Sequence, residues 1–134
     1  MKNMNLFSAI AFAIGSLFSA NVCATAPEHT VYQVYRPVDL GEGFPPPKDI
    51  FISIGLVDGV RKGSKLDVYR RVTSFDNLTS RHMGDHMIPV GRLKIIHVDE
   101  KTAIARADRF VSLEEEPALM PQAIMIGDVV RQVQ

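Results

Sequence analysis

The chain has 134 residues, 46% of them hydrophobic, and its 15 basic and 15 acidic residues give a formal net charge of zero. A chain of this length is expected to form one domain, because two separate cores would each bury too little apolar surface. The balanced charge lacks the basic excess typical of nucleic-acid binding, so we expect no nucleic-acid partner.

The first 24 residues have the pattern of a secretory signal peptide. Lys2 gives a basic start, an apolar run covers residues 6–18, and Val22-Cys23-Ala24 offers a cleavage site. The run is shorter than the roughly 20 residues of a membrane-spanning helix. We therefore expect cleavage after Ala24 and a periplasmic or secreted product without its single cysteine. An uncleaved anchor and a lipid anchor at Cys23 are the alternatives.

Segments rich in β-forming residues follow the signal peptide. We expect strands at 30–36, 49–55, 65–74, 88–99 and 102–112, and one strand or two short ones kinked at Gly127 within 123–133. No segment has the period of a long helix. The sequence therefore predicts an all-β fold of five to six strands.

The segments between these strands are rich in prolines or polar residues. Four prolines in residues 37–49 exclude a regular helix there and predict an extended spacer. The strand before this spacer could pair across the domain edge or serve as an arm. We expect residues 75–87 to form a long hairpin loop, and residues 113–122 a loop or one helical turn.

Alternation along the strands predicts which side chains face the core. Ile50, Ile52 and Ile54 share one face of their strand, and Leu66 and Val68 share one face of the next. If residues 99–101 form the turn of a hairpin, the large Leu93 and Ile95 lie opposite three small residues, Ala103, Ala105 and Ala107. Large residues facing small ones suit the tapering interior of a small barrel.

Glycines at four-residue intervals mark the stretch ISIGLVDGVRKGSKLDVYR. This spacing matches neither phosphate-binding pattern, and the stretch leads into an expected strand rather than a helix. Asp58-Gly59 and Lys62-Gly63 are turn signals, so we expect a structural corner in which Leu56, Val57 or Val60 plugs the end of a barrel. The expected structural turn residues are Gly55, Asp58, Gly59 and Gly63, with Gly127 and Asp128 near the C-terminus.

Three stretches carry a resemblance: IGLVDGVRKGSKLDVYRR, VGRLKIIHVDEKTAIARA and IMIGDVV. They resemble the C-terminal SH3-like domain of the flagellar assembly protein T family and, more loosely, the β-barrel of rod-shape protein C. The resemblance implies a bacterial SH3-like β-barrel over 50–134, preceded by an N-terminal strand and spacer over 25–49. The matching residues are Gly55, Gly59, Gly63, Ser64, Val68, Tyr69, Arg70, Gly91, Leu93, Thr102, Ala103, Ala105, Gly127 and Asp128.

Candidates for chemistry are few. His82, Asp85 and His86, flanked by two methionines, could hold zinc or copper, although nothing places them on one face. Ser53, Ser64 and Ser74 have no histidine near them in sequence, so we expect no enzyme and no cofactor. A basic cluster around the corner could meet an acidic partner or be a solvated face; it comprises Arg61, Lys62, Lys65, Arg70 and Arg71.

The leading functional hypothesis is an exported, non-enzymatic β-barrel module that binds an unidentified protein partner or serves as a structural component of the bacterial cell envelope. The expected binding segments are residues 75–87 and the strand at 32–35, since small barrels bind through loops or exposed strand edges. One alternative is a small periplasmic metal-binding protein that uses His82 and His86. Another is a stand-alone component related to flagellar or cell-shape assemblies, which the resemblance implies.

Overall fold

A computed structural model describes residues 27–41, 43–44, 46–112, 114, 117 and 123–133. The expected signal peptide, Cys23 and most of residues 113–122 lie outside the described residues, so the expectations about them stay predictions. None of the described segments forms a helix with the length and hydropathy of a membrane span.

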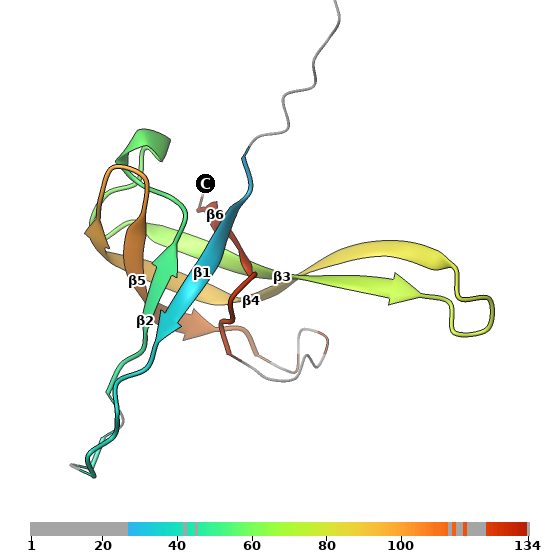
Figure 1. The fold of residues 1–134 in the computed structure, drawn as a ribbon, viewed down its shortest axis with the longest axis horizontal. Coiled ribbons are helices and arrows are strands. Elements are labelled where there is room, and N and C mark those ends of the chain that lie inside the picture. The colour runs from blue at the N-terminus through green and yellow to red at the C-terminus, as the bar shows by residue number, and fades with distance from the viewer. Residues whose placement is uncertain are drawn as a thin grey trace, which may run out of the picture.

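The described chain is all-β. One antiparallel sheet closes into a barrel with the strand order β1-β2-β5-β4-β3-β6 (Figure 1). The strands are β1 (His29–Tyr35), β2 (Asp49–Ile52), β3 (Lys65–Phe75), β4 (His82–Val98), β5 (Ala103–Phe110) and β6 (Val129–Gln132), and a single turn of 3-10 helix, η1 (Leu56–Asp58), follows β2. The all-β prediction is confirmed. The strand expected within 123–133 occupies only its second half, because the chain turns at Gly127.

β1 is part of the barrel. It pairs with β2 from Val31↔Ile52 to Tyr35↔Asp49 and with β6 at His29↔Val130 and Thr30↔Val129. The first strand therefore does not form an arm separate from a barrel that begins at residue 50. The proline-rich segment is the loop of the β1–β2 hairpin, because it joins two strands that pair directly with each other.

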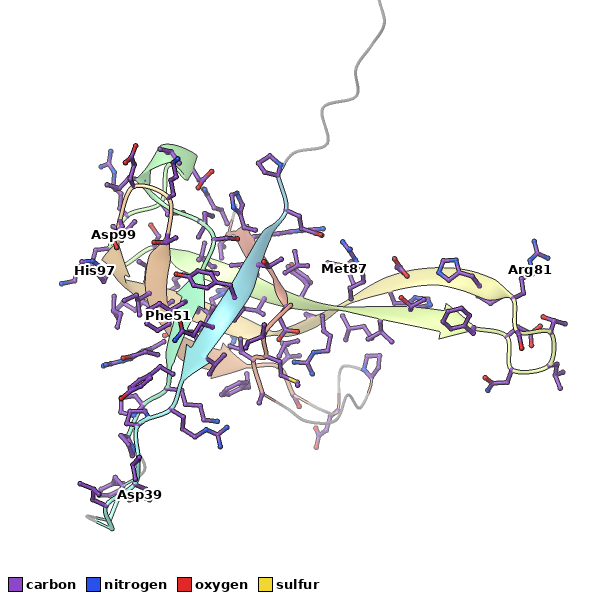
Figure 2. The ribbon with its side chains drawn as sticks, viewed as in Figure 1. Asp39, Phe51, Arg81, Met87, His97 and Asp99 are labelled. Atoms are coloured by element: carbon purple, nitrogen blue, oxygen red, sulfur yellow. The ribbon has the colours of Figure 1, made fainter. Side chains whose placement is uncertain are left out.

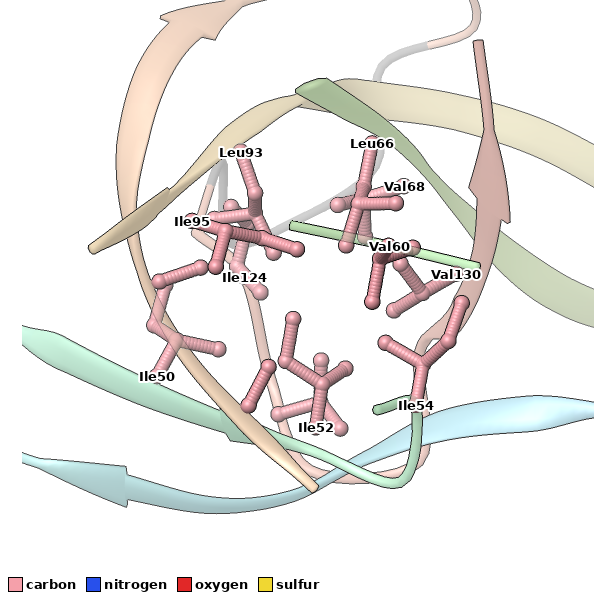
Figure 3. Close-up of a cluster of buried hydrophobic side chains, with 13 residues drawn as sticks. Ile50, Ile52, Ile54, Val60, Leu66, Val68, Leu93, Ile95, Ile124 and Val130 are labelled. Atoms are coloured by element: carbon pink, nitrogen blue, oxygen red, sulfur yellow. The ribbon is translucent and has the colours of Figure 1, made fainter. Parts of the chain in front are cut away.

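The core fills the barrel interior with the side chains that the alternation predicts (Figure 3). Ile50, Ile52 and Ile54 are buried, and so are Leu66 and Val68. Burial of such a side chain contributes about 1.5–3 kcal/mol, so this cluster is the main source of stability. The other members of the cluster are Val31, Val60, Leu93, Ile95, Ala103, Ala105, Ile124 and Val130.

Large residues of β4 face small residues of β5, as expected. The register pairs Leu93 with Ala107 and Ile95 with Ala105. Leu93, Ile95 and Ala105 are buried, whereas Ala107 is exposed. Ala107 lies next to an irregularity in the ladder, where Arg92 pairs with Arg109 and Asp108 is left out of the register.

The long hairpin loop expected over 75–87 is wrong, because most of this segment is strand. β3 and β4 pair from Lys65↔Lys94 to Phe75↔His82, and only residues 76–81 form the turn. The two strands project from the barrel as a twisted ribbon (Figure 1). Both faces of the ribbon meet solvent, so its sequence lacks the apolar–polar alternation that marks a half-buried strand.

Candidate functional site

The glycine-rich corner is a compact turn after β2. Gly59 ends η1 with φ +84° and Gly63 has φ +89°, a left-handed conformation that glycine adopts without steric cost. Gly55 is needed for a different reason, because a Cβ there would lie 2.5 Å from the carbonyl oxygen of Glu100. Of the three apolar residues expected to plug the barrel, Val60 is buried, whereas Leu56 and Val57 are exposed.

The corner uses its backbone N–H groups internally. Gly55 donates to the carboxylate of Asp58 at 2.9 Å, and Gly59 donates to the carbonyl of Leu56 at 3.0 Å. Gly63 donates to the carbonyl of Ile95 at 2.8 Å, and β3 follows the corner directly. The three glycine N–H groups therefore bind the protein itself and do not form a cradle for a phosphate.

Asp128 is a buried anchor rather than an ordinary turn residue. It follows Gly127, whose φ is +93°. The two oxygens of its carboxylate accept hydrogen bonds from Nε and Nη2 of Arg70, each at 2.9 Å, and one also accepts from the backbone N–H of Met125 at 2.8 Å. The hydrogen bond to Asp128 raises the pKa of Arg70, while burial opposes this shift. The ion pair ties the turn before β6 to β3.

The basic residues near the corner do not form one charged face. Arg70 binds Asp128, Arg71 pairs with Glu28, and Lys65 pairs with Asp108 at 3.1 Å. Alternate residues of a strand point to opposite sides of the sheet, so Arg70 lies on the face of β3 opposite to Lys65 and Arg71. The structure therefore gives no support to this cluster as a binding surface.

The candidate metal ligands lie on the ribbon and do not converge. The register pairs Phe75 with His82 and Val72 with His86, and leaves Met83 unpaired between them. Paired residues point to the same face, and this bulge therefore places His82 and His86 on opposite faces. Within the described residues, no group of three or more metal-ligating side chains occurs.

Asp85 shares the face of His82 but is engaged in local bonds. It accepts a hydrogen bond from Oγ1 of Thr73 at 2.8 Å and lies 3.4 Å from Nε2 of His82. The bond from Thr73 and then the contact with His82 lower the pKa of Asp85. These contacts are typical of a solvated ribbon surface.

One contact was missed in the sequence. Oγ of Ser74 lies 3.1 Å from Nε2 of His86, so a serine with no histidine near it in sequence has one near it in space. The two residues are 12 positions apart and meet only because β3 and β4 pair. Among the described residues, His86 has no carboxylate partner that could orient it, and the exposed pair lacks the third member of a nucleophilic triad.

The ribbon carries exposed apolar side chains. Leu78 in its turn is 96% exposed, and Phe75 and Met83 near the turn are also exposed. Figure 2 shows Met87 close to the barrel and Arg81 at the far end of the ribbon. Large apolar side chains gathered at the end of a projecting element are typical of an interaction surface.

The β1–β2 loop is a second projection with an apolar end. Val38, Leu40 and Phe44 are exposed, and Phe44 is 90% exposed. Asp39 lies near the far end of this loop, away from the barrel (Figure 2). Sequence reasoning missed these residues as a binding candidate, although large apolar residues in a proline-rich spacer were the available signal.

A groove of about 1230 Å³ is lined by β6, by the residues that lead into β1, and by alternate residues of β3 from Asp67 to Arg71. Its charged residues are matched within the protein, because Arg71 pairs with Glu28 and His29 lies 3.6 Å from Asp58. Arg131 stacks over the ring of Tyr69, 5.3 Å from its centre. The groove therefore supplies no cluster of unmatched charges for a ligand.

Comparisons with known proteins do not indicate a function for this chain. The sequence matches no model of a known protein family, and it matches no curated protein.

Proposed function

We propose that this chain is an exported, non-enzymatic β-barrel module that binds another protein of the bacterial cell envelope. The observation that carries the proposal is the β3–β4 ribbon with its exposed Phe75, Leu78 and Met83. A two-stranded ribbon alone is at best marginally stable in water, and exposed apolar side chains add no stability until a partner covers them. The signal-peptide pattern of residues 1–24 supports export.

We also propose that the barrel is of the SH3-like type. The support is that the motifs of the resemblance fall on defined parts of the barrel: the corner, the paired strands β3, β4 and β5, and the turn before β6. In this proposal the barrel is the rigid base and its projections carry the recognition. The Arg70–Asp128 ion pair lies at the base of the ribbon, since the pairing of β3 with β6 ends at Tyr69.

Photo-crosslinking in living cells tests the proposal. A photoreactive phenylalanine analogue replaces Leu78, at the ribbon turn, or Phe44, in the β1–β2 loop. Val57 is the matched control, because it is an exposed apolar residue, 65% exposed, on the corner. We expect a discrete protein adduct in the envelope fraction at Leu78, and none at Val57.

The same cells test export. We expect the purified protein to begin after Ala24, as N-terminal sequencing would show. Full-length protein retained in the cytoplasm would contradict export. Adducts no stronger at Leu78 and Phe44 than at Val57 would contradict partner binding through the projections.

A further inference from the structure

The two outer edges of the ribbon differ. In β4, Pro89 has no N–H to donate, and the register leaves Val90 and Met83 unpaired as bulges. Prolines and bulges are devices that prevent an edge strand from pairing with another chain. β3 has neither along the ribbon, because both irregularities of this ladder place the extra residue in β4. The edge of β3 is therefore the one able to accept a further strand.

The available part of that edge is short and defined. β6 pairs with β3 from Leu66 to Tyr69, and the turn that contains Asp128 contacts Arg70. From Arg71 to Phe75, the described chain places no third strand beside β3. Valine, threonine and phenylalanine favour strands, so this edge suits strand addition.

We propose that a second copy of this chain occupies the edge, with the two β3 strands antiparallel about a twofold axis at Thr73. Residues that pair across two strands point to the same face of the sheet. A twofold axis perpendicular to the sheet leaves each side chain on its own face, so the residue nearest the axis must pair with the same residue of the second copy. Centring on Thr73 pairs it with Thr73 of the second copy and uses only 71–75. Centring on Val72 would bring in Arg70, which the Asp128 turn contacts.

The side chains are complementary in this register. Arg71 is the only charged residue between positions 71 and 75. It pairs with Phe75 of the second copy rather than with another arginine, and Val72 pairs with Ser74. Like charges therefore do not face each other, and a threonine–threonine pair is favourable across a sheet.

The resulting sheet has the order β4-β3-β3-β4. It gives the ribbon the additional strands that a stable sheet in water needs. The assembly is closed, because a twofold contact uses the same surface on both copies. Of the apolar residues proposed to meet the envelope partner, Leu78 at the ribbon turn lies outside the paired segment, whereas Phe75 lies within it.

Disulfide trapping tests the twofold axis. In a chain with Cys23→Ser, the single cysteine of the Thr73→Cys variant can form a disulfide only with the same position in another copy. We expect rapid covalent dimer formation on mild oxidation, and far slower formation for Thr79→Cys, an exposed control in the ribbon turn. Equal rates for the two variants would overturn the proposal, and faster trapping through Val72→Cys would overturn the register.

Charge exchange provides a second test that does not need a disulfide. Thr73→Lys and Thr73→Glu place like charges opposite each other, so we expect each variant alone to sediment as a folded monomer. An equimolar mixture is expected to restore the dimer, because lysine then faces glutamate. An unsubstituted chain that sediments as a monomer at its highest soluble concentration, or a mixture that stays monomeric, would overturn the proposal.

Discussion

Arg70 and Asp128 are 58 residues apart in the chain, yet their side chains form a two-point ion pair in which both N–O distances are 2.9 Å. The exposed fractions of the side chains are 15% and 4%. Nη2 of Arg70 also donates to the carbonyl of Ala123 at 2.6 Å. Arg70 therefore holds both ends of the turn that leads into β6, at the point where the ribbon leaves the barrel.

Loss of the Asp128 carboxylate is expected to destabilise the barrel strongly. Asp128→Ala removes the carboxylate that pairs with the largely buried charge of Arg70, and breaking such a pair costs about 3–5 kcal/mol. The free energy of unfolding in urea measures this cost. The matched control is Asp49→Ala, which breaks the more exposed pair with Arg106 and is expected to cost much less. Similar losses for both variants would contradict the role of Asp128.

The corner is expected to distinguish Gly55 from Gly59. A Cβ at Gly55 would lie 2.5–2.6 Å from backbone atoms of Glu100 and Lys101, so Gly55→Asn forces the corner apart. We expect a loss of stability of about 1–3 kcal/mol, the usual cost of overpacking. Gly59→Asn is expected to be nearly neutral, because Gly59 has open space around it and asparagine tolerates a positive φ. Thermal unfolding compares the two variants, and the reverse order would refute this account.

The pairing of Ile95 with Ala105 predicts compensation between strands. Ala105→Ile inserts a large side chain opposite Ile95 in the filled core, and Ile95→Ala leaves a cavity. Each single change is expected to cost about 2–3 kcal/mol. The double variant exchanges the two volumes, so we expect it to be more stable than the sum of the single effects predicts. A double-mutant cycle in urea gives the coupling energy, and strict additivity would contradict direct packing.

The ribbon turn is expected to respond to acid. The hydroxyl of Thr79 and then the N–H of Leu78 donate to Asp76 and lower the pKa of this carboxyl group. The folded turn thus favours the carboxylate. Its contribution is complete above the ordinary pKa of aspartate and is lost as the pH falls through the lower folded value. Backbone amide NMR signals of residues 77–80 should report this change, and Asp76→Asn should remove it. A turn insensitive to acid in the unsubstituted chain would show that these bonds do not order it.

Sequence alone determined the barrel-forming strands. Ile50, Ile52 and Ile54 alternate with residues of the other face, and this alternation is a local property of an extended chain. The corner could also be predicted from the sequence, because Asp58-Gly59 and Lys62-Gly63 are local turn signals. Both kinds of signal act over a few residues, so they can be read without knowing what the strands pack against.

Tertiary structure alone decided that β1 belongs to the barrel, that β3 and β4 extend into the ribbon, and that Arg70 contacts Asp128. β1 joins the barrel by pairing with β2, the next strand in the chain, and with β6, the last, and no local pattern specifies the pairing with β6. Residues 82–87 extend because β3 lies beside them and supplies backbone hydrogen bonds, although their own sequence suggested a loop. Alternation predicts which face of a strand is buried. It gives no prediction where both faces meet water, or where a contact joins segments distant in the sequence.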